Sequence, residues 1–325
     1  MFSFPSFKRR TVKAQVLFHR DYLRFQGGHL KVFHYFNHLK NTNLYNPTIY
    51  FTEQSIQDKS NPWNSTERLS SWLPAKADII FLAGLDWQAV LQDKAFLKKQ
   101  KKIPVINLIQ GLSHAEPTDI KYKFLSEPAI RICVSPQVSA AIQSTGHVNG
   151  PVFTIPNGVD LDSLPAVLPE EIKDIDLLIV AIKKPELGLA LEKSLSGKCG
   201  KIINLTHLTP RNKFLNLLSR SKICLCLPHF TEGFYLPALE GMALGAVVVC
   251  PDCIGNRAFC SDQKNCFFPR YEQESIIAAV DKAMSLSTIE RKKLIQHALL
   301  TVDNYSLKNE ASQFLDIMSN IKSLW

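Results

Sequence analysis

The sequence predicts an α/β protein with two doubly wound domains, each built on a parallel sheet. Apolar, β-rich runs alternate with helical segments through both halves of the chain, which is the pattern of βαβ units. The length of 325 residues corresponds to about two domains. A segment at 156–171, rich in Pro, Asp and Gly and without periodicity, separates the two alternating regions.

The first half contains a run of predicted strands and one clear helix. The helix covers 28–39 and follows the glycine pair Gly27 and Gly28. The strands are expected at 14–19, 47–51, 77–83, 103–109, 130–135 and 152–156.

The second half repeats the alternation and ends in helices. Its strands are expected at 174–182, 201–206, 222–228, 246–250 and 265–269, and its final helices at 272–286, 288–302 and 307–321. We therefore expect a first domain at 1–160, a second at 161–306, and a C-terminal helix at 307–325 that packs back on the first. Ligands of parallel sheets bind beyond the carboxyl ends of the strands, which directs attention to the loops 19–28, 110–117, 183–186, 228–236 and 251–257.

Composition limits the class of protein. Hydrophobic residues make up 46% of the chain and charged residues 21%, as in soluble globular proteins. The N-terminus, MFSFPSFKRR, has no apolar h-region, and no later window approaches the roughly 18 apolar residues of a membrane-spanning helix. We therefore expect a cytoplasmic protein with reduced cysteines.

The net charge of +9 is concentrated in the first half. Residues 1–160 carry 19 Lys and Arg against 11 Asp and Glu, whereas residues 161–325 carry 19 against 18. An anionic partner of the first half is indicated, which could be a membrane surface, a phosphorylated acceptor or nucleic acid. The densest basic cluster is Lys98–Lys102. No nucleic-acid recognition motif is present, so nucleic acid is not the expected partner.

The N-terminal decapeptide has the composition of a weak membrane anchor. It sets Phe2, Phe4 and Phe7 beside Lys8, Arg9 and Arg10. Aromatic and basic side chains together favour peripheral docking on an anionic membrane, and a disordered terminus is the alternative.

The stretch TEGFYLPALEGMALGAVVV (231–249) sets two glutamates eight residues apart around a proline. Pro237 suits the first position of a helix, so Glu232 is expected in the preceding loop and Glu240 in the first helical turn. Unpaired backbone N–H groups at 234–236, with the helix dipole behind them, would bind a phosphate. Because carboxylates accept paired hydrogen bonds from vicinal hydroxyls, the combination favours a sugar nucleotide.

The longer stretch TEGFYLPALEGMALGAVVVCPDCIGN resembles the donor-binding signature of the family-4, or group 1, glycosyltransferases of GT-B fold. Three further stretches agree with that family in order and spacing: FQGGHLKVFHYF (25–36), ICVSPQVSAAI (132–142) and TIPNGVD (154–160). The resemblance covers about residues 12–305. It implies a first domain that binds the acceptor and a second that binds a nucleotide-sugar donor, facing each other across a cleft.

The resemblance also implies roles for residues of the second domain. Glu232 would contact the transferred sugar near the reacting face, and Glu240 would hold the ribose. The family places a basic pair after the first strand of this domain, where VAIKKPELG offers Lys183 and Lys184. The usual form has an arginine several residues before a lysine, so either lysine could contact the phosphate. The backbone that would cradle the diphosphate is that of Gly233, Phe234, Tyr235 and Leu236.

The loop DCIGNRAF (252–259) is similar to the family's glycine loop that closes over the nucleotide. Gly255 and Asn256 match it. Arg257 would pair either with phosphate or with a nearby acid.

The first domain offers weaker candidates. Gly27 and Gly28 would let backbone N–H groups approach the donor phosphate or the acceptor, or they form an ordinary turn. Many relatives have a histidine directly after the strand at 103–109, where this chain has Gln110. His114 follows slightly later and is the candidate for contact with the donor sugar or an acceptor hydroxyl.

Members of the family retain the anomeric configuration of the transferred sugar. On this resemblance the lysines and the helix N-terminus stabilise the charge of the departing diphosphate, so we expect no metal and no cofactor besides the donor substrate. Two metal-like patterns are discounted. The Asp-x-Asp at 160–162 follows PNGV in a turn, and the Cys-x2-Cys-x6-Cys-x5-Cys pattern from Cys250 to Cys266 begins and ends on predicted strands.

The expected function is therefore retaining, metal-independent transfer of a sugar from a nucleotide-sugar to a saccharide or lipid-linked saccharide, in surface polysaccharide biosynthesis. The alternative is a catalytically weak relative that binds a sugar nucleotide or glycan, motivated by the atypical lysine loop and the displaced histidine. No motif identifies the donor sugar or the acceptor.

Overall fold

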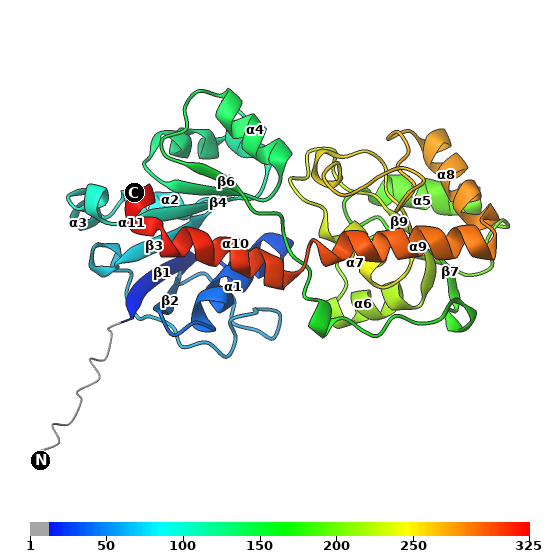
Figure 1. Cartoon of the computed structure of the whole chain (residues 1–325), viewed down its shortest axis with the longest axis horizontal. Coiled ribbons are helices and arrows are strands. Elements are labelled where there is room, and N and C mark those ends of the chain that lie inside the picture. Colours follow the sequence, from blue (N-terminus) through cyan, green and yellow to red (C-terminus); the bar gives the residue numbers. More distant parts are fainter. Residues whose placement is uncertain (1–12) are drawn as a thin grey trace, which may run out of the picture.

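The computed structural model describes residues 13–325, which form two parallel sheets covered by helices (Figure 1). The predicted architecture of two doubly wound α/β domains is confirmed. The N-terminal aromatic and basic residues that suggest membrane docking lie outside the described part of the chain. Within residues 13–325, no helix has both the length and the apolar character needed to cross a bilayer.

The first sheet has six parallel strands in the order β2-β1-β3-β4-β5-β6. Strands β3 and β4, IIFLA and VINLI, are buried at every position because helices cover both faces of the sheet. The strands are β1 Ala14–Arg20, β2 Tyr45–Phe51, β3 Ile79–Ala83, β4 Val105–Ile109, β5 Ile130–Cys133 and β6 Val152–Thr154.

The second sheet has four parallel strands in the order β10-β9-β7-β8. Its first strand in sequence, β7, lies inside the sheet and pairs with β8 on one side and β9 on the other. The strands are β7 Ile175–Val180, β8 Ile202–Leu205, β9 Ser221–Cys226 and β10 Val247–Val249.

A fifth strand was expected in this sheet at 265–269, and that prediction is wrong. Phe267 is the one residue of this stretch that bridges β10, at Val249, and Cys266 bridges Asp262 instead. The backbone N–H of Phe268 donates to the Asp262 carboxylate at 2.9 Å instead of to a neighbouring strand. Pro269 has no N–H to donate, so only its carbonyl continues the pairing, by accepting from the Asp252 N–H at 2.9 Å.

Helices begin where the sequence supplies caps. Ser135 accepts a hydrogen bond from the Val138 N–H, and Pro136 occupies the first turn of α4. Ser287 and Glu290 form a capping box at the start of α9. The helices are α1 Gly27–Lys40, α2 Asp86–Leu91, α3 Lys94–Leu97, α4 Pro136–Ser144, α5 Pro185–Leu195, α6 Arg211–Ser219, α7 Leu236–Ala243, α8 Gln273–Ser285, α9 Thr288–Asp303, α10 Leu307–Ser319 and α11 Ile321–Leu324.

The two domains are joined at a point where two chain segments cross. Val159 follows β6, and its N–H donates to the Tyr305 carbonyl at 2.7 Å, while the N–H of Leu307 donates to the Val159 carbonyl at 3.0 Å. Gly158 leaves no room for a side chain, since a Cβ there would lie 2.6 Å from the backbone of Ser306. Glycine is therefore needed where the segments cross.

Helix α10 leaves the second domain and lies against the first, whereas α9 lies against the second (Figure 1). The Phe314 side chain is buried, with its ring edge-on to that of Tyr35 in α1 at 4.8 Å between centroids. The helix predicted at 307–321 is interrupted at Asn320, after which α11 begins. The indole Nε1 of Trp325 donates to the Lys101 carbonyl at 3.0 Å, so the C-terminus lies on the first domain.

A buried charged cluster fixes α10 to α1 and to the crossing point. Glu310 forms an ion pair with Lys31 and accepts a hydrogen bond from the Gly158 N–H at 2.6 Å. Its other carboxylate oxygen lies 2.9 Å from His38 Nε2. Lys31 also donates to the Gly158 carbonyl at 3.2 Å. The Lys31 and Glu310 side chains therefore bind the carbonyl and the N–H of Gly158, respectively.

Candidate functional site

Helix α7 carries the second glutamate of the sequence motif, Glu240, and the loop before it carries the first, Glu232. The helix begins at Leu236, and Pro237 lies in its first turn. Glu240 is thus the fifth residue of the helix, one residue further along than expected. Gly241 lets the helix approach the sheet, because a Cβ there would lie 3.0 Å from the Val248 side chain in β10. Packing on β10 therefore fixes the position of Glu240.

Glu240 is buried and half-satisfied. One of its oxygens, Oε1, accepts a hydrogen bond from Arg211 at 2.5 Å. The other oxygen, Oε2, is buried and has no partner within the described chain. Leaving a buried carboxylate oxygen unpaired costs free energy, so this oxygen is available to a ligand hydroxyl. Arg211 is the first residue of α6 and is a site residue that the sequence analysis did not identify.

Glu232 lies in the loop before α7 and contacts the predicted lysine loop. Its Oε1 is 3.4 Å from the ammonium of Lys183, and both side chains are partly exposed. An exposed pair of this kind contributes about 0–1 kcal/mol, so a phosphate could readily draw Lys183 away. Lys184 instead occupies the N-cap position of α5. Of the two lysines, Lys183 is therefore the one that reaches the motif.

The glycines of the motif allow close backbone packing. Gly233 lies at the contact between the domains, where a Cβ would be 2.4 Å from the Gln110 carbonyl oxygen. The neighbouring residue Glu232 forms an antiparallel bridge with Gly111 of the first domain. Gly255 is equally confined, because its Cβ would lie 2.7 Å from the Phe234 nitrogen.

Aromatic side chains of the expected diphosphate cradle point into the protein. Phe234 and Tyr235 are both buried. The Phe234 ring packs against Phe259 and Tyr305 at centroid distances of 5.2 and 5.9 Å. Only the backbone of this segment is thus left to meet a ligand, together with the unpaired N–H groups of the first turn of α7.

The glycine loop 252–259 is held by its own side chains. Asn256 is buried, with Oδ1 accepting from the Cys253 N–H and Nδ2 donating to the Pro251 carbonyl, both at 3.1 Å. Arg257 forms two hydrogen bonds of 2.8 Å with the Asp252 carboxylate. Of the two partners considered for Arg257, the acid is the one observed. Asn256 therefore shapes the loop from inside.

The cysteines of the zinc-like pattern are separate buried thiols. Cys250, Cys253, Cys260 and Cys266 are free. Burial raises the pKa of the Cys253 thiol, which keeps it protonated. Across residues 13–325 no cluster of three or more His, Cys, Asp or Glu side chains has the arrangement of a metal site.

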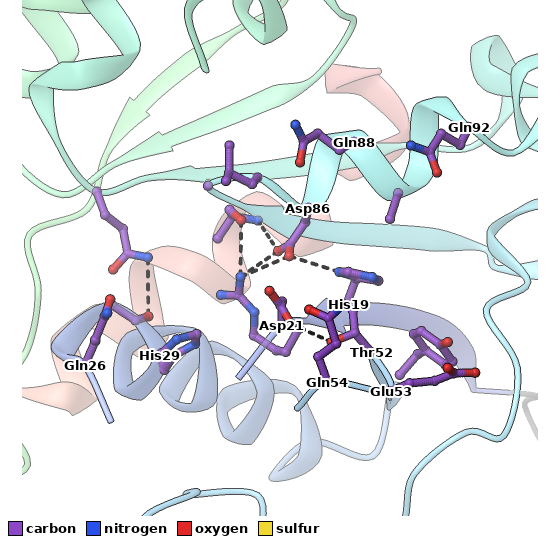
Figure 2. Close-up of a pocket in the computed structure, with 18 residues that line it drawn as sticks. His19, Asp21, Gln26, His29, Thr52, Glu53, Gln54, Asp86, Gln88 and Gln92 are labelled. Carbon is purple, nitrogen blue, oxygen red and sulfur yellow. Dashed lines mark hydrogen bonds and ion pairs between the residues drawn. The ribbon is translucent and has the colours of Figure 1, made fainter. Parts of the chain in front are cut away.

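The first domain contains a cavity of about 680 Å³ at the carboxyl ends of its strands (Figure 2). Parallel sheets place ligands at this edge. The lining comes from the ends of β1, β2, β3 and β4, the start of α1, and α2. Its residues are His19, Arg20, Asp21, Gln26, Gly28, His29, Tyr50, Thr52, Glu53, Gln54, Ala83, Gly84, Leu85, Asp86, Gln88, Ala89, Gln92 and Gln110.

Asp86 organises one wall of this cavity (Figure 2). Its carboxylate accepts from the Ala83 N–H at 2.8 Å and lies 3.0 Å from His19 Nδ1. Arg20 binds the same carboxylate, with NH2 2.9 Å from Oδ2. All three side chains are buried. This group was not predicted from the sequence, although the loop 84–86 also follows a predicted strand.

His29 and the glycine pair occupy the α1 side of the cavity. His29 Nδ1 is buried without a partner in the described chain. Burial, and next the nearby Arg20 charge, lower the pKa of His29 to about 4, so its ring is neutral at pH 7. Gly28 lines the cavity, and its carbonyl accepts a hydrogen bond from Gln110 at 3.3 Å. Gly27 lies at the start of α1 with open space around it.

His114 does not line the cavity. Its side chain is buried, with Nδ1 3.2 Å from the Gly111 carbonyl oxygen. Burial lowers the pKa of His114 to about 4. Gln110, and not His114, therefore lines the cavity at the position where the family resemblance suggests a histidine.

The two halves of the site meet at one place. Gln110 and Gly111 of the first domain contact Glu232 and Gly233 of the second. This contact joins the cavity of the first domain to the glutamate and lysine pair of the second. The second domain can thus hold an anionic ligand with vicinal hydroxyls, and the cavity of the first domain can hold a polar ligand beside it.

Comparison with known protein families finds a match in the second domain. Residues 164–300 match the family model described as glycosyl transferases group 1. No curated protein sequence gives a significant match.

Solved structures resemble the whole chain at low identity. Sucrose-phosphate synthase from Thermosynechococcus elongatus matches with a TM-score of 0.72 at 11% identity, over 96% of this chain and 100% of that one. HepE from Anabaena, in complex with UDP-glucose, matches with a TM-score of 0.74 at 11% identity, over 94% and 99%. The galactosyltransferase WaaB of the lipopolysaccharide outer core matches with a TM-score of 0.69 at 14% identity, over 94% and 99%. These likenesses establish a shared two-domain GT-B fold, and within that fold the domain at 164–300 is similar to the group 1 glycosyl transferases.

Proposed function

We propose that the protein transfers a sugar from a nucleotide-sugar donor to a saccharide or lipid-linked saccharide acceptor. The observation that carries the proposal is the buried, unpartnered Oε2 of Glu240 in the group 1 domain. A ribose hydroxyl would satisfy this oxygen, while Arg211 holds the other one. One structural neighbour was solved with UDP-glucose, which supports a nucleotide-sugar as the donor.

In this proposal the diphosphate lies at the N-terminus of α7. Backbone N–H groups there have no partner within the helix, and the helix dipole favours negative charge. Lys183 moves from Glu232 to the phosphate, and Glu232 becomes free to orient the transferred sugar. The bond from the anomeric carbon to the phosphate oxygen breaks, the acceptor hydroxyl forms its bond on the same face, and its proton passes to the departing diphosphate, so the configuration is retained. Positive groups stabilise the departing diphosphate without a metal ion.

We also propose that the reaction takes place in the cytoplasm, in surface polysaccharide biosynthesis, with peripheral contact to an anionic membrane. The excess positive charge of residues 1–160 and the exposed cluster Lys98–Lys102 support this location. One neighbour is a galactosyltransferase of the lipopolysaccharide outer core, which supports a role in glycan assembly.

A transfer assay tests the proposal. The full chain would be incubated with UDP-, GDP-, ADP-, CMP- and dTDP-linked sugars and a panel of glycosides, with and without EDTA. Mass spectrometry detects the glycoside product, and NMR gives its anomeric configuration. We expect one donor class to be used, at the same rate in EDTA, with retention. Inversion, or a rate abolished by EDTA and restored by a divalent ion, would contradict the mechanism.

The alternative is a catalytically weak relative that binds a sugar nucleotide or glycan. It is favoured by one observation, that Gln110 lines the cavity at the position of the family's histidine whereas His114 does not. Donor binding by calorimetry without hydrolysis or transfer to any glycoside would support it over an active transferase.

A further inference from the structure

The proposed function leaves open which kind of acceptor the cavity of the first domain binds. Its volume of about 680 Å³ is in the range of roughly 300–1,000 Å³ found for small-molecule sites. Figure 2 shows Gln26 at one side of the cavity and Gln92 at the other, with Asp86 between them. The side chains that line it allow the charge of the occupant to be inferred.

Amide side chains are the most frequent polar groups of the lining. Each amide offers a donor and an acceptor close together, which matches a sugar hydroxyl that both donates and accepts. Within the described residues, Gln110 is the one member of this set whose side chain makes a hydrogen bond, to Gly28. The set is Gln26, Gln54, Gln88, Gln92 and Gln110.

The charged groups of the lining are acidic on balance. Asp21, Glu53 and Asp86 contribute three negative charges against the single positive charge of Arg20. Arg20 is already neutralised, since its NH2 lies 2.9 Å from Asp86 Oδ2 and both side chains are buried. His29 is neutral at pH 7. A phosphate in this cavity would meet net negative charge and a cation that is already paired.

Two buried polar atoms beside the cavity also lack partners. Arg20 Nε and His29 Nδ1 are buried and make no hydrogen bond within residues 13–325. Unsatisfied buried groups are uncommon, and ligand hydroxyls are chemically suited to pair with both. These unpaired atoms therefore favour a ligand that carries hydroxyl groups.

We propose that this cavity binds an uncharged saccharide, the end of the acceptor, and discriminates against phosphorylated or otherwise anionic acceptors. The inference rests on the proposed function, because it assigns the acceptor class of the same reaction. The end of the cavity formed by Gly28 and Gln110 adjoins the interdomain bridge between Gly111 and Glu232. A saccharide bound at this end of the cavity would lie next to the donor-binding domain. The basic cluster Lys98–Lys102 is not part of the lining.

Ligand binding to the full chain tests the inference without requiring turnover. Saturation-transfer NMR would compare methyl and octyl glycosides of glucose, galactose, mannose and N-acetylglucosamine with the corresponding hexose 6-phosphates. We expect at least one glycoside to bind at least tenfold more tightly than its 6-phosphate counterpart. Equal affinity for the methyl and octyl forms would indicate a soluble saccharide, and tighter binding of the octyl form would indicate a glycolipid headgroup.

Charge-changing variants test whether the cavity is the part of the protein that distinguishes glycosides from hexose 6-phosphates. Glu53→Lys introduces a cation at an exposed position of the lining and should raise 6-phosphate affinity at least fivefold. Glu67→Lys makes the same change at an exposed position of the first domain outside the lining and should have no effect. Gln88→Leu should weaken glycoside binding at least threefold.

Three outcomes would overturn the inference: a 6-phosphate that binds as tightly as its glycoside, identical behaviour of Glu53→Lys and Glu67→Lys, or no glycoside binding at all. A nucleotide-sugar titration of the same samples separates this failure from that of the proposed function. Donor binding without glycoside binding refutes the acceptor inference alone, whereas loss of both refutes the proposed function as well.

Discussion

Replacing Glu310 with glutamine should destabilise the folded chain by about 3–5 kcal/mol, the usual cost of leaving one member of a buried ion pair uncompensated. Glu310 is buried between α10 and α1, where it pairs with Lys31 and His38 and accepts the Gly158 N–H. The glutamine keeps the shape of the side chain but leaves the Lys31 ammonium without its counter-charge.

The pKa of Glu310 gives a second estimate of this contribution. Burial raises that pKa, but the Lys31 charge and the His38 hydrogen bond outweigh it and hold the value at about 2, below the usual 4.5. A difference of this size corresponds to about 3 kcal/mol. Burial lowers the pKa of Lys31, which offsets part of the gain. We therefore expect Glu310→Gln to lower the free energy of unfolding by about 3 kcal/mol, the lower end of the range given above.

The sign of the pH dependence follows from the depressed pKa. The contribution of Glu310 is fully present above about pH 4.5, its usual pKa, and is lost as the pH falls toward about 2. Wild type should therefore lose stability faster than Glu310→Gln over that interval. The two proteins should converge at the acid end, because both then carry an uncharged side chain.

Thermal unfolding followed by circular dichroism measures the effect. A loss of about 3 kcal/mol should lower Tm by at least about 6 °C in a domain of this size. Asp316→Asn, at an exposed position of the same helix, is the matched control and should leave Tm unchanged. The double variant Lys31→Met/Glu310→Gln should recover much of the loss, because no unpaired charge remains buried. A Glu310→Gln protein as stable as Asp316→Asn, or a double variant no better than the single one, would refute the reasoning.

Three further predictions concern the second domain. Gly233→Ala should cost about 1–3 kcal/mol through overpacking, because its Cβ would lie 2.4 Å from the Gln110 carbonyl oxygen; a calorimetric Tm equal to that of wild type would contradict this. Lys183→Ala should lower kcat by about 10²–10³, whereas Lys184→Ala should lower it less than tenfold; equal losses in steady-state kinetics would remove the distinction. Arg211→Ala should weaken donor binding at least about tenfold by releasing Glu240, and unchanged titration calorimetry would count against that role.

Local patterns were sufficient to predict the fold and the motif on α7. The alternation of apolar runs placed the strands of both sheets, since a strand such as VINLI is buried along its whole length. Pro237 marked the start of α7 to within one residue, which put Glu232 in a loop and Glu240 on a helix. These features depend on neighbouring residues, and neighbours are what a sequence displays directly.

Contacts between distant residues could not be predicted in the same way. Arg211 meets Glu240 from another helix, and nothing in PRNKF distinguishes it from a surface arginine. Asp86 meets His19 only because β1 and β3 pair in one register, which sets the ends of the two strands side by side.

The most direct test of the account is a titration calorimetry experiment on the full chain with the donor panel, comparing wild type, Glu240→Gln and the exposed control Glu274→Gln. If Glu240 holds the ribose, one nucleotide-sugar class binds wild type and the control equally, with or without EDTA. Glu240→Gln then binds at least about tenfold more weakly, as expected for hydrogen bonds to a charged group. Equal affinity of Glu240→Gln and wild type, or no binding by any of the three proteins, would contradict the donor site described here.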